Sequence, residues 1–80
     1  MWEEKKHYLE RVIVFNNFSE ALAAMVQIGL LAERHNHHPE IINVYNKLTL
    51  RLTSHDAGNV VTDKDWRLSE ELDAVLPKNI

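Results

Sequence analysis

Alternating apolar and polar positions indicate three β-strands in this chain. Residues 8–15 alternate in this way, with Arg11 as the one break on the more apolar face. A period of two together with β-branched content favours a strand. Residues 41–45 and 48–53 are expected to form two further strands, joined by a tight turn at residues 46–47.

Between the first two strands the spacing changes and predicts a helix. From Phe18 to about His35, apolar residues recur at intervals of three and four. Asn17 is expected to cap this helix, with Glu20 completing part of a capping box. The helix is apolar over more than the stripe of about 100° typical of a surface helix. Two interpretations stay open: a central helix packed on the sheet, with alanines as neutral filler, or a second face that meets another subunit.

A last helix is expected after a loop at residues 56–59. Thr62 is a good capping residue, and Asp65 follows three positions later. The apolar stripe then consists of Leu68, Leu72, Val75 and Leu76, and Pro77 ends it. The order strand, helix, strand, strand, helix predicts an α+β fold, a two-layer sandwich with both helices on one face of an antiparallel sheet. We expect residues 1–80 to form a single domain.

Composition narrows the classes of function. The net charge is −3 and no run of lysine or arginine occurs, which argues against a nucleic-acid surface. No apolar run is long enough to span a membrane, and the first residues do not resemble a signal peptide. The absence of cysteine fits the cytoplasm. Because so short a chain buries only a modest core, we expect it to form a homo-oligomer.

Five histidines make proton chemistry or metal binding the leading possibilities. Three of them, His37, His38 and His55, stand where helices or strands are expected to end, and they could line one cleft. Asp65 could hold one of these histidines, or it could cap its own helix. Their spacing matches no usual zinc signature, so no metal is expected. The other two histidines, His7 and His35, are expected to be solvated, and the tryptophans, Trp2 and Trp66, to pack.

Seven residues together form a specific pattern. An acidic residue, three spacers, two histidines and a proline are followed by five spacers and an aromatic residue, then nine spacers and a histidine, with an aspartate ten positions further. These residues are Glu33, His37, His38, Pro39, Tyr45, His55 and Asp65. The pattern resembles that of the pterin-4a-carbinolamine dehydratases, and the resemblance covers nearly the whole chain. Two departures stand out: the helix that members commonly carry before the counterpart of Trp2 is not expected within these 80 residues, and Ile41 replaces a frequent tryptophan.

The resemblance implies an activity and roles for these residues. Such enzymes remove water from a 4a-hydroxytetrahydropterin to give a quinonoid dihydropterin, without metal or cofactor. By similarity, His37 is the first choice for general acid/base, His38 positions substrate and assists, and His55 is an alternative acid. Asp65 holds a histidine or a pterin amine, and the substrate pocket also takes Glu33, Pro39 and Tyr45.

The resemblance also implies an assembly and an alternative role. Similar proteins form dimers of dimers, so a homotetramer is expected. The alternative function is a non-enzymatic assembly or transcriptional cofactor module on the same fold, and a related enzyme with a different heterocyclic substrate is a third possibility. The intact set of His37, His38, His55 and Asp65 favours catalysis.

Overall fold

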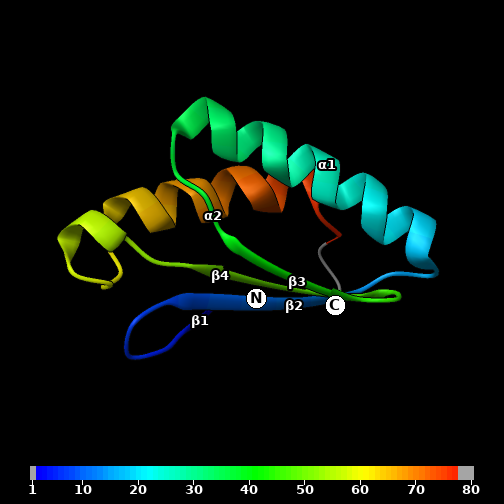
Figure 1. The fold of residues 1–80 in the computed structure, drawn as a ribbon, viewed down its shortest axis with the longest axis horizontal. Helices are drawn as coiled ribbons and strands as arrows, with labels where there is room; N and C mark the ends of the chain where they lie inside the picture. The colour runs from blue at the N-terminus through cyan, green and yellow to red at the C-terminus, as the bar shows by residue number, and fades with distance from the viewer. Residues whose placement is uncertain (1, 78–80) are drawn as a thin grey trace.

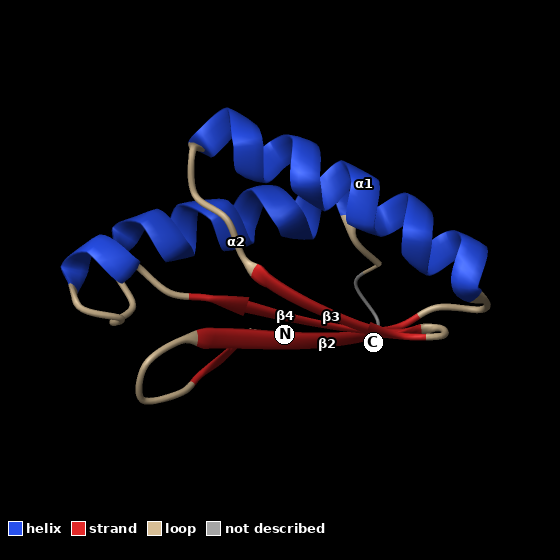
Figure 2. Ribbon diagram, viewed as in Figure 1, coloured by secondary structure: helices blue, strands red, loops and turns tan. Residues whose placement is uncertain are grey.

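The computed structural model describes residues 2–77 and has two layers, a four-stranded sheet and two helices on one face of it (Figures 1 and 2). All strand pairs are antiparallel, in the order β1-β2-β4-β3. The strands are β1 (Glu3–Glu4), β2 (Leu9–Val14), β3 (Glu40–Val44) and β4 (Lys47–Leu52); the helices are α1 (Phe18–His35) and α2 (Asp63–Val75). The predicted α+β class is confirmed. The sequence did not predict β1, whose two glutamates are exposed and show no apolar alternation.

The core lies between the sheet and the helices. In the two central strands, the residues that face the helices form cross-strand pairs, with Leu9 opposite Leu52 and Ile13 opposite Leu48. Each of these four side chains is fully buried. Burial of a large aliphatic side chain stabilises the fold by roughly 1.5 to 3 kcal/mol. The alternation seen in the sequence therefore marks the face of the sheet that the helices cover.

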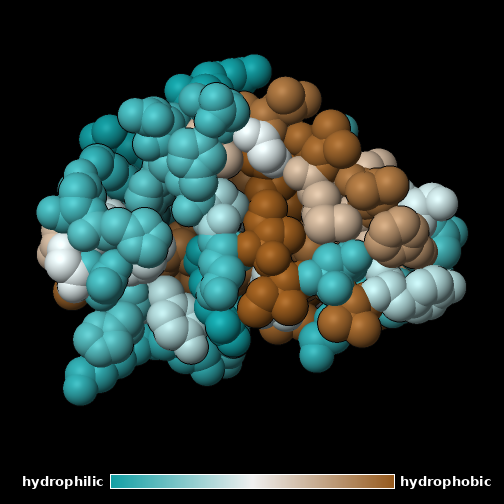
Figure 3. Space-filling view, viewed as in Figure 1, coloured by the Kyte–Doolittle hydropathy of each residue, from teal (hydrophilic) through white to brown (hydrophobic). Residues whose placement is uncertain are grey.

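Alanines form most of the buried side of α1. The buried residues of this helix are Ala21, Ala24, Ile28 and Ala32. The interpretation of the alanines as neutral filler is therefore wrong, because small side chains are what α1 presents to the core. Its large apolar side chains at Phe18, Leu22, Val26 and Leu30 are between 43% and 65% exposed. Figure 3 shows apolar side chains gathered over α1 and beside it.

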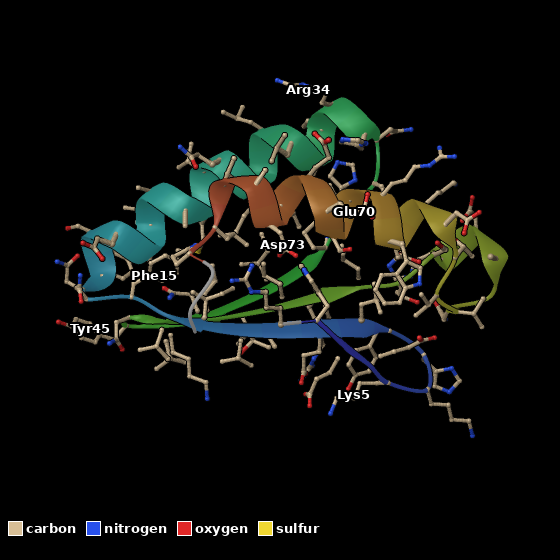
Figure 4. The ribbon with its side chains drawn as sticks, turned by 180° about the vertical axis from the view of Figure 1, so that it is seen from behind. Lys5, Phe15, Arg34, Tyr45, Glu70 and Asp73 are labelled. Atoms are coloured by element: carbon tan, nitrogen blue, oxygen red, sulfur yellow. The ribbon has the colours of Figure 1, made fainter. Side chains whose placement is uncertain are left out.

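The polar break in β2 has a structural explanation. Arg11 is only 1% exposed and its Nη1 donates to Asp73 Oδ1 at 2.6 Å, while Nη2 donates to the carbonyl of Pro77. Trp2 Nε1 donates to the same Asp73 oxygen at 2.8 Å. Asp73 lies on α2, on the side towards the sheet (Figure 4). This partly buried ion pair therefore joins the first strands to the end of α2. Trp2 packs as expected, whereas Trp66 is exposed.

The hairpin between β3 and β4 turns one residue earlier than expected. The turn residues are Tyr45 and Asn46, and Lys47 already belongs to β4. Tyr45 has a φ of 51°, in the left-handed region. The side chain of Asn43 supports this backbone by donating to the carbonyls of Tyr45 and Lys47. A polar side chain within β3, rather than a glycine in the turn, stabilises the hairpin.

The ends of several helices and strands lie close together at one end of the molecule. There α1 ends, β3 begins, β4 ends and α2 begins, with a short 3-10 helix, η1 (His55–Ala57), between β4 and α2 (Figure 1). The sequence predicted a loop at residues 56–59 but not this helical turn. In the part of the chain that is described, neither helix is long and apolar enough to cross a membrane.

Candidate functional site

The end of α1 directs the histidine pair out of the helix. Asn36 has a φ of 49° and closes the helix through bonds from its N–H to the carbonyls of Ala32 and Glu33. Asparagine tolerates this left-handed conformation better than most residues. The N–H of His37 also bonds to the Ala32 carbonyl, at 3.1 Å. The chain therefore turns sharply, and His37 and His38 lie between α1 and β3, with Pro39 half-buried behind them.

The ring of His37 contacts a buried carboxylate. Its Nε2 lies 2.6 Å from Asp65 Oδ1, and Asp65 is fully buried in the first turn of α2. The other oxygen, Oδ2, accepts from the Thr62 N–H and from the Ser54 hydroxyl, each at 2.8 Å. Two donors on one oxygen favour an ionised carboxylate, which can only accept hydrogen bonds. In neutral His37 the proton is therefore on Nε2, and Nδ1 is the available nitrogen.

His38 forms a similar pair at the surface. Its Nε2 lies 2.6 Å from Glu33 Oε1, but both side chains are more than half exposed. Glu33 lies in the last turn of α1, so the pair spans the connection from helix to strand. With the Glu33 carboxylate as acceptor, neutral His38 has its proton on Nε2, and its Nδ1 is free.

His55 lines the same region and belongs to η1. It begins η1, and its Nδ1 lies 2.8 Å from Asn59 Oδ1. With the amide oxygen as acceptor, Nδ1 carries the proton and Nε2 is available. Gly58, with a φ of 89°, ends this turn in the left-handed region that favours glycine.

Two open cavities meet at the histidines. The first, of about 330 Å³, is lined by Asn36, His37, His38, His55, Asp56 and Lys64. The second, of about 340 Å³, is lined by Tyr8, His38, Glu40, Arg51, Thr53 and His55. The three predicted catalytic histidines therefore line one cavity. His38 and His55 belong to both cavities and form their common border.

Charged side chains around these cavities are paired. In the first cavity, Lys64 Nζ lies 2.9 Å from Asp56 Oδ2, and this hydrogen bond lowers the pKa of the Asp56 carboxyl below its usual value. In the second, Arg51 Nε donates to Glu10 at 2.8 Å, a bond that raises the pKa of the already basic guanidinium. The Arg51 guanidinium also lies over the Tyr8 ring, 5.2 Å from its centre. The second cavity therefore has a fixed, planar cation in its wall.

The structure brings most, but not all, of the predicted site residues together. His37, His38, His55, Asp65, Glu33 and Pro39 lie at the end where α2 begins. Tyr45 is in the β3–β4 hairpin near Phe15, at the other end of the sheet (Figure 4). Within a single chain, Tyr45 therefore does not join the histidines.

Other residues of this site were missed in the sequence. Ser54, Asp56, Lys64 and Arg51 carry no distinctive spacing, and their partners depend on strand register and on η1. The sequence offered one indication of Ser54: it is a polar residue that continues the alternation of leucines just after β4. Among residues 2–77, no three His, Cys, Asp or Glu side chains are grouped to hold a metal ion. The expectation that no metal is needed stays a prediction.

Taken together, these features define a small α+β protein with a histidine-lined cavity at one end of its sheet. A family model described as pterin 4 alpha carbinolamine dehydratase matches residues 1–75. Relatives from Solibacter usitatus and Opitutus terrae, provisionally named pterin-4-alpha-carbinolamine dehydratases, are 46% and 42% identical over 74 residues. Each alignment covers 92% of this chain, with 77% and 76% of the respective relative.

Solved structures agree with this family. A Brucella melitensis protein described as a transcriptional coactivator/pterin dehydratase has a TM-score of 0.88 at 32% identity, covering 95% of this chain and 82% of that one. A pterin dehydratase-like protein identified as a RuBisCO assembly factor has a TM-score of 0.74 at 17% identity, over 94% and 86%, and shows the fold alone. The chain belongs to the pterin-4a-carbinolamine dehydratase family, and the resemblance found in the seven-residue motif is confirmed.

Proposed function

We propose that this protein dehydrates a 4a-hydroxytetrahydropterin to the quinonoid dihydropterin, in the recycling of a tetrahydrobiopterin-type cofactor. The observation that carries the proposal is the cavity lined by His37, His38 and His55, in which His37 is held by a fully buried Asp65. Histidine titrates near neutral pH, so a group of histidines can both donate and accept protons. Family membership supports the same activity.

The reaction needs one proton delivered and one removed. The hydroxyl on carbon 4a leaves as water when an acid protonates it, and the neighbouring ring nitrogen loses its proton as the new carbon–nitrogen double bond forms. In the proposed mechanism, Nδ1 of His37 donates or accepts one of these two protons, and Asp65 stabilises the imidazolium form of His37. His38 or His55 transfers the other proton and orients the pterin ring of the substrate. Each such transfer contributes roughly 100- to 10,000-fold to the rate.

A turnover assay tests this function directly. Freshly generated 4a-hydroxytetrahydropterin dehydrates spontaneously, and its absorbance change is followed by stopped flow with and without the wild-type protein. We expect catalytic amounts of protein to accelerate the change with saturation in substrate. A rate equal to that of buffer at all protein concentrations would reject the proposal and leave the alternative role as an assembly or transcriptional cofactor module.

The same assay tests whether a metal takes part. Three histidines without a metal-type spacing are better explained as proton donors and acceptors. We therefore expect full turnover after exhaustive dialysis against a strong chelator. Loss of activity that zinc alone restores would contradict this prediction.

We also propose that a second copy of the chain covers the exposed apolar residues of α1, in a dimer of dimers. The observation in favour is a row of apolar side chains along α1 that stay exposed to water in the single chain: Phe18, Leu22, Val26 and Leu30. Sedimentation at micromolar concentration should show a tetramer for the wild type and a smaller species for Val26→Glu. Gln27→Glu, which adds a charge to the same helix outside this row, is the matched control. A wild-type monomer of 9.3 kDa would refute the proposal.

A further inference from the structure

The hydroxyl of Ser54 lies directly behind the pair of Asp65 and His37. Ser54 is 1% exposed, lies two residues after the end of β4, and takes no part in the proton transfers proposed above. Its Oγ lies 2.8 Å from Asp65 Oδ2 and 2.6 Å from Thr62 Oγ1. A buried hydroxyl in contact with the carboxylate that holds His37 can act on the site without touching the substrate.

Counting protons fixes the direction of these bonds. A serine hydroxyl has one proton, and an ionised carboxylate has none to give. Ser54 therefore donates to Asp65 Oδ2, and the Thr62 hydroxyl must donate to Ser54. Because the Thr62 N–H fills the second acceptor position on Oδ2, the remaining oxygen, Oδ1, is left for His37. Hydrogen bonds arranged in one direction strengthen one another in a buried site.

The backbone of Ser54 supports a second histidine. Its carbonyl accepts the N–H groups of Ala57 and Asn59, and its own N–H donates to the Val60 carbonyl. These bonds close the turn that contains η1 and His55. The main chain of Ser54 thus anchors the turn of His55, while its side chain contacts the carboxylate behind His37.

We propose that Ser54 is a positioning residue, which fixes the orientation of the Asp65 carboxylate and thereby keeps the proton of neutral His37 on Nε2. Its catalytic consequence rests on the proposed function, because a fixed tautomer matters only if His37 exchanges protons through Nδ1. Without the Ser54 hydroxyl, Oδ2 keeps a single donor, the Thr62 N–H. The carboxylate can then rotate, and His37 loses the acceptor that selects its tautomer.

Nitrogen NMR tests the positioning role without any pterin. Ring ¹⁵N shifts of His37, measured in alkaline solution where histidines are neutral, should show one tautomer, with the proton on Nε2, in the wild type. Ser54→Ala should give a mixture of tautomers, and Ser54→Thr, which keeps the hydroxyl, should restore the wild-type spectrum. Thr62→Val, which removes the hydroxyl behind Ser54 but keeps the backbone N–H, should give a partial change even if Ser54→Ala does not fold.

Ser69→Ala is the matched control. Ser69 is also buried, on α2, and its hydroxyl donates to the carbonyl of Trp66 rather than to the site. We expect this variant to keep the wild-type His37 spectrum. A wild-type spectrum in both Ser54→Ala and Thr62→Val, or an equal disturbance in Ser69→Ala, would overturn the proposal.

Kinetics then separate this inference from the proposed function. Ser54→Ala should lower kcat about tenfold, by analogy with the loss of an outer hydrogen-bond partner behind a metal-bound histidine, with KM nearly unchanged. Ser54→Thr should recover the rate. If the wild type has no dehydratase activity, the proposed function fails while the NMR result still decides the positioning role. An unchanged kcat in a folded Ser54→Ala, with an active wild type, would overturn the catalytic consequence.

Discussion

Adjacent histidines, His37 and His38, each place Nε2 at 2.6 Å from a carboxylate oxygen, in different surroundings. For His37 and Asp65, the side chains are 11% and 0% exposed. For His38 and Glu33, the values are 55% and 76%. Asp65 also accepts two further hydrogen bonds from Ser54 and Thr62, whereas no other bond is found for the Glu33 side chain among residues 2–77.

Because the two pairs differ in burial, their equal contact distances do not imply equal contributions to stability. Water and salt screen the surface pair, and such pairs typically stabilise a protein by about 0 to 1 kcal/mol. The buried pair is screened far less, and leaving one of its partners alone costs several kcal/mol. We therefore expect the Asp65 pair to set the chemistry of its histidine, and the Glu33 pair to adjust it slightly.

The largest effect is expected from His37→Ala. Removal of the histidine held by Asp65 should lower dehydration turnover roughly 100-fold, and by at least about tenfold, because it removes an acid or base. Steady-state turnover of 4a-hydroxytetrahydropterin measures the loss. His7→Ala is the control, because His7 is exposed and lines neither cavity. Wild-type rates in a folded His37→Ala would remove His37 from the mechanism.

A second test compares the two carboxylates by stability. Asp65→Ala should lower the free energy of unfolding by about 3 kcal/mol, because it leaves buried donors without an acceptor. Glu33→Ala, at an exposed position, should change it by no more than about 0.5 kcal/mol. Urea denaturation at neutral pH measures both values. Equal losses would mean that burial does not distinguish the pairs.

High salt should remove the contribution of the surface pair, His38 and Glu33, to the free energy of unfolding. Glu33→Gln is expected to change the free energy of unfolding by about 0.5 kcal/mol or less at low ionic strength. The difference from wild type should vanish at about 1 M salt, where charges are screened within roughly 3 Å. Denaturation at the two salt concentrations checks this prediction, which a salt-independent difference would contradict.

The smallest effect concerns the exposed pair of Asp56 and Lys64. The Lys64 hydrogen bond lowers the pKa of Asp56, so the pair adds stability at neutral pH that is lost as the pH falls through the pKa of the folded state. In Lys64→Gln, the Asp56 pKa should rise towards its usual value, as measured by NMR titration of the carboxyl carbon. An unchanged titration curve would show that Lys64 does not bond to Asp56 in solution.

Sequence reasoning predicted the layers well and the exact packing less well. Period-two alternation located β2 and β4 because the helices cover only one face of the sheet. The alternation did not explain Arg11 on the apolar face of β2, because its partner, Asp73, is far along the chain and comes near Arg11 only in the folded protein. It misjudged the alanines of α1 for a related reason: small residues become the contact surface only when the neighbouring layer lies close.

The histidine site was predicted through its motif, and its supporting contacts were not. His37, His38, His55 and Asp65 could be named because their spacing is specific. The pairing of Asp65 with His37 rather than another histidine follows from where α1 ends and α2 begins. Ser54 is a small polar residue beside a histidine, and only the turn through η1 brings its hydroxyl against Asp65.

The most direct test compares the dehydration turnover of two matched amide variants, Asp65→Asn and Glu33→Gln, in one stopped-flow assay. The quantity of interest is the ratio of their losses of turnover relative to wild type. In Asp65→Asn, the amide oxygen keeps the bonds from Ser54 and Thr62, so its NH₂ group faces His37 and reverses the tautomer, as a similar change does in serine proteases. We predict that turnover falls at least roughly tenfold more in Asp65→Asn than in Glu33→Gln. Equal turnover in the two variants, both folded, would contradict the claim that the buried pair governs proton transfer.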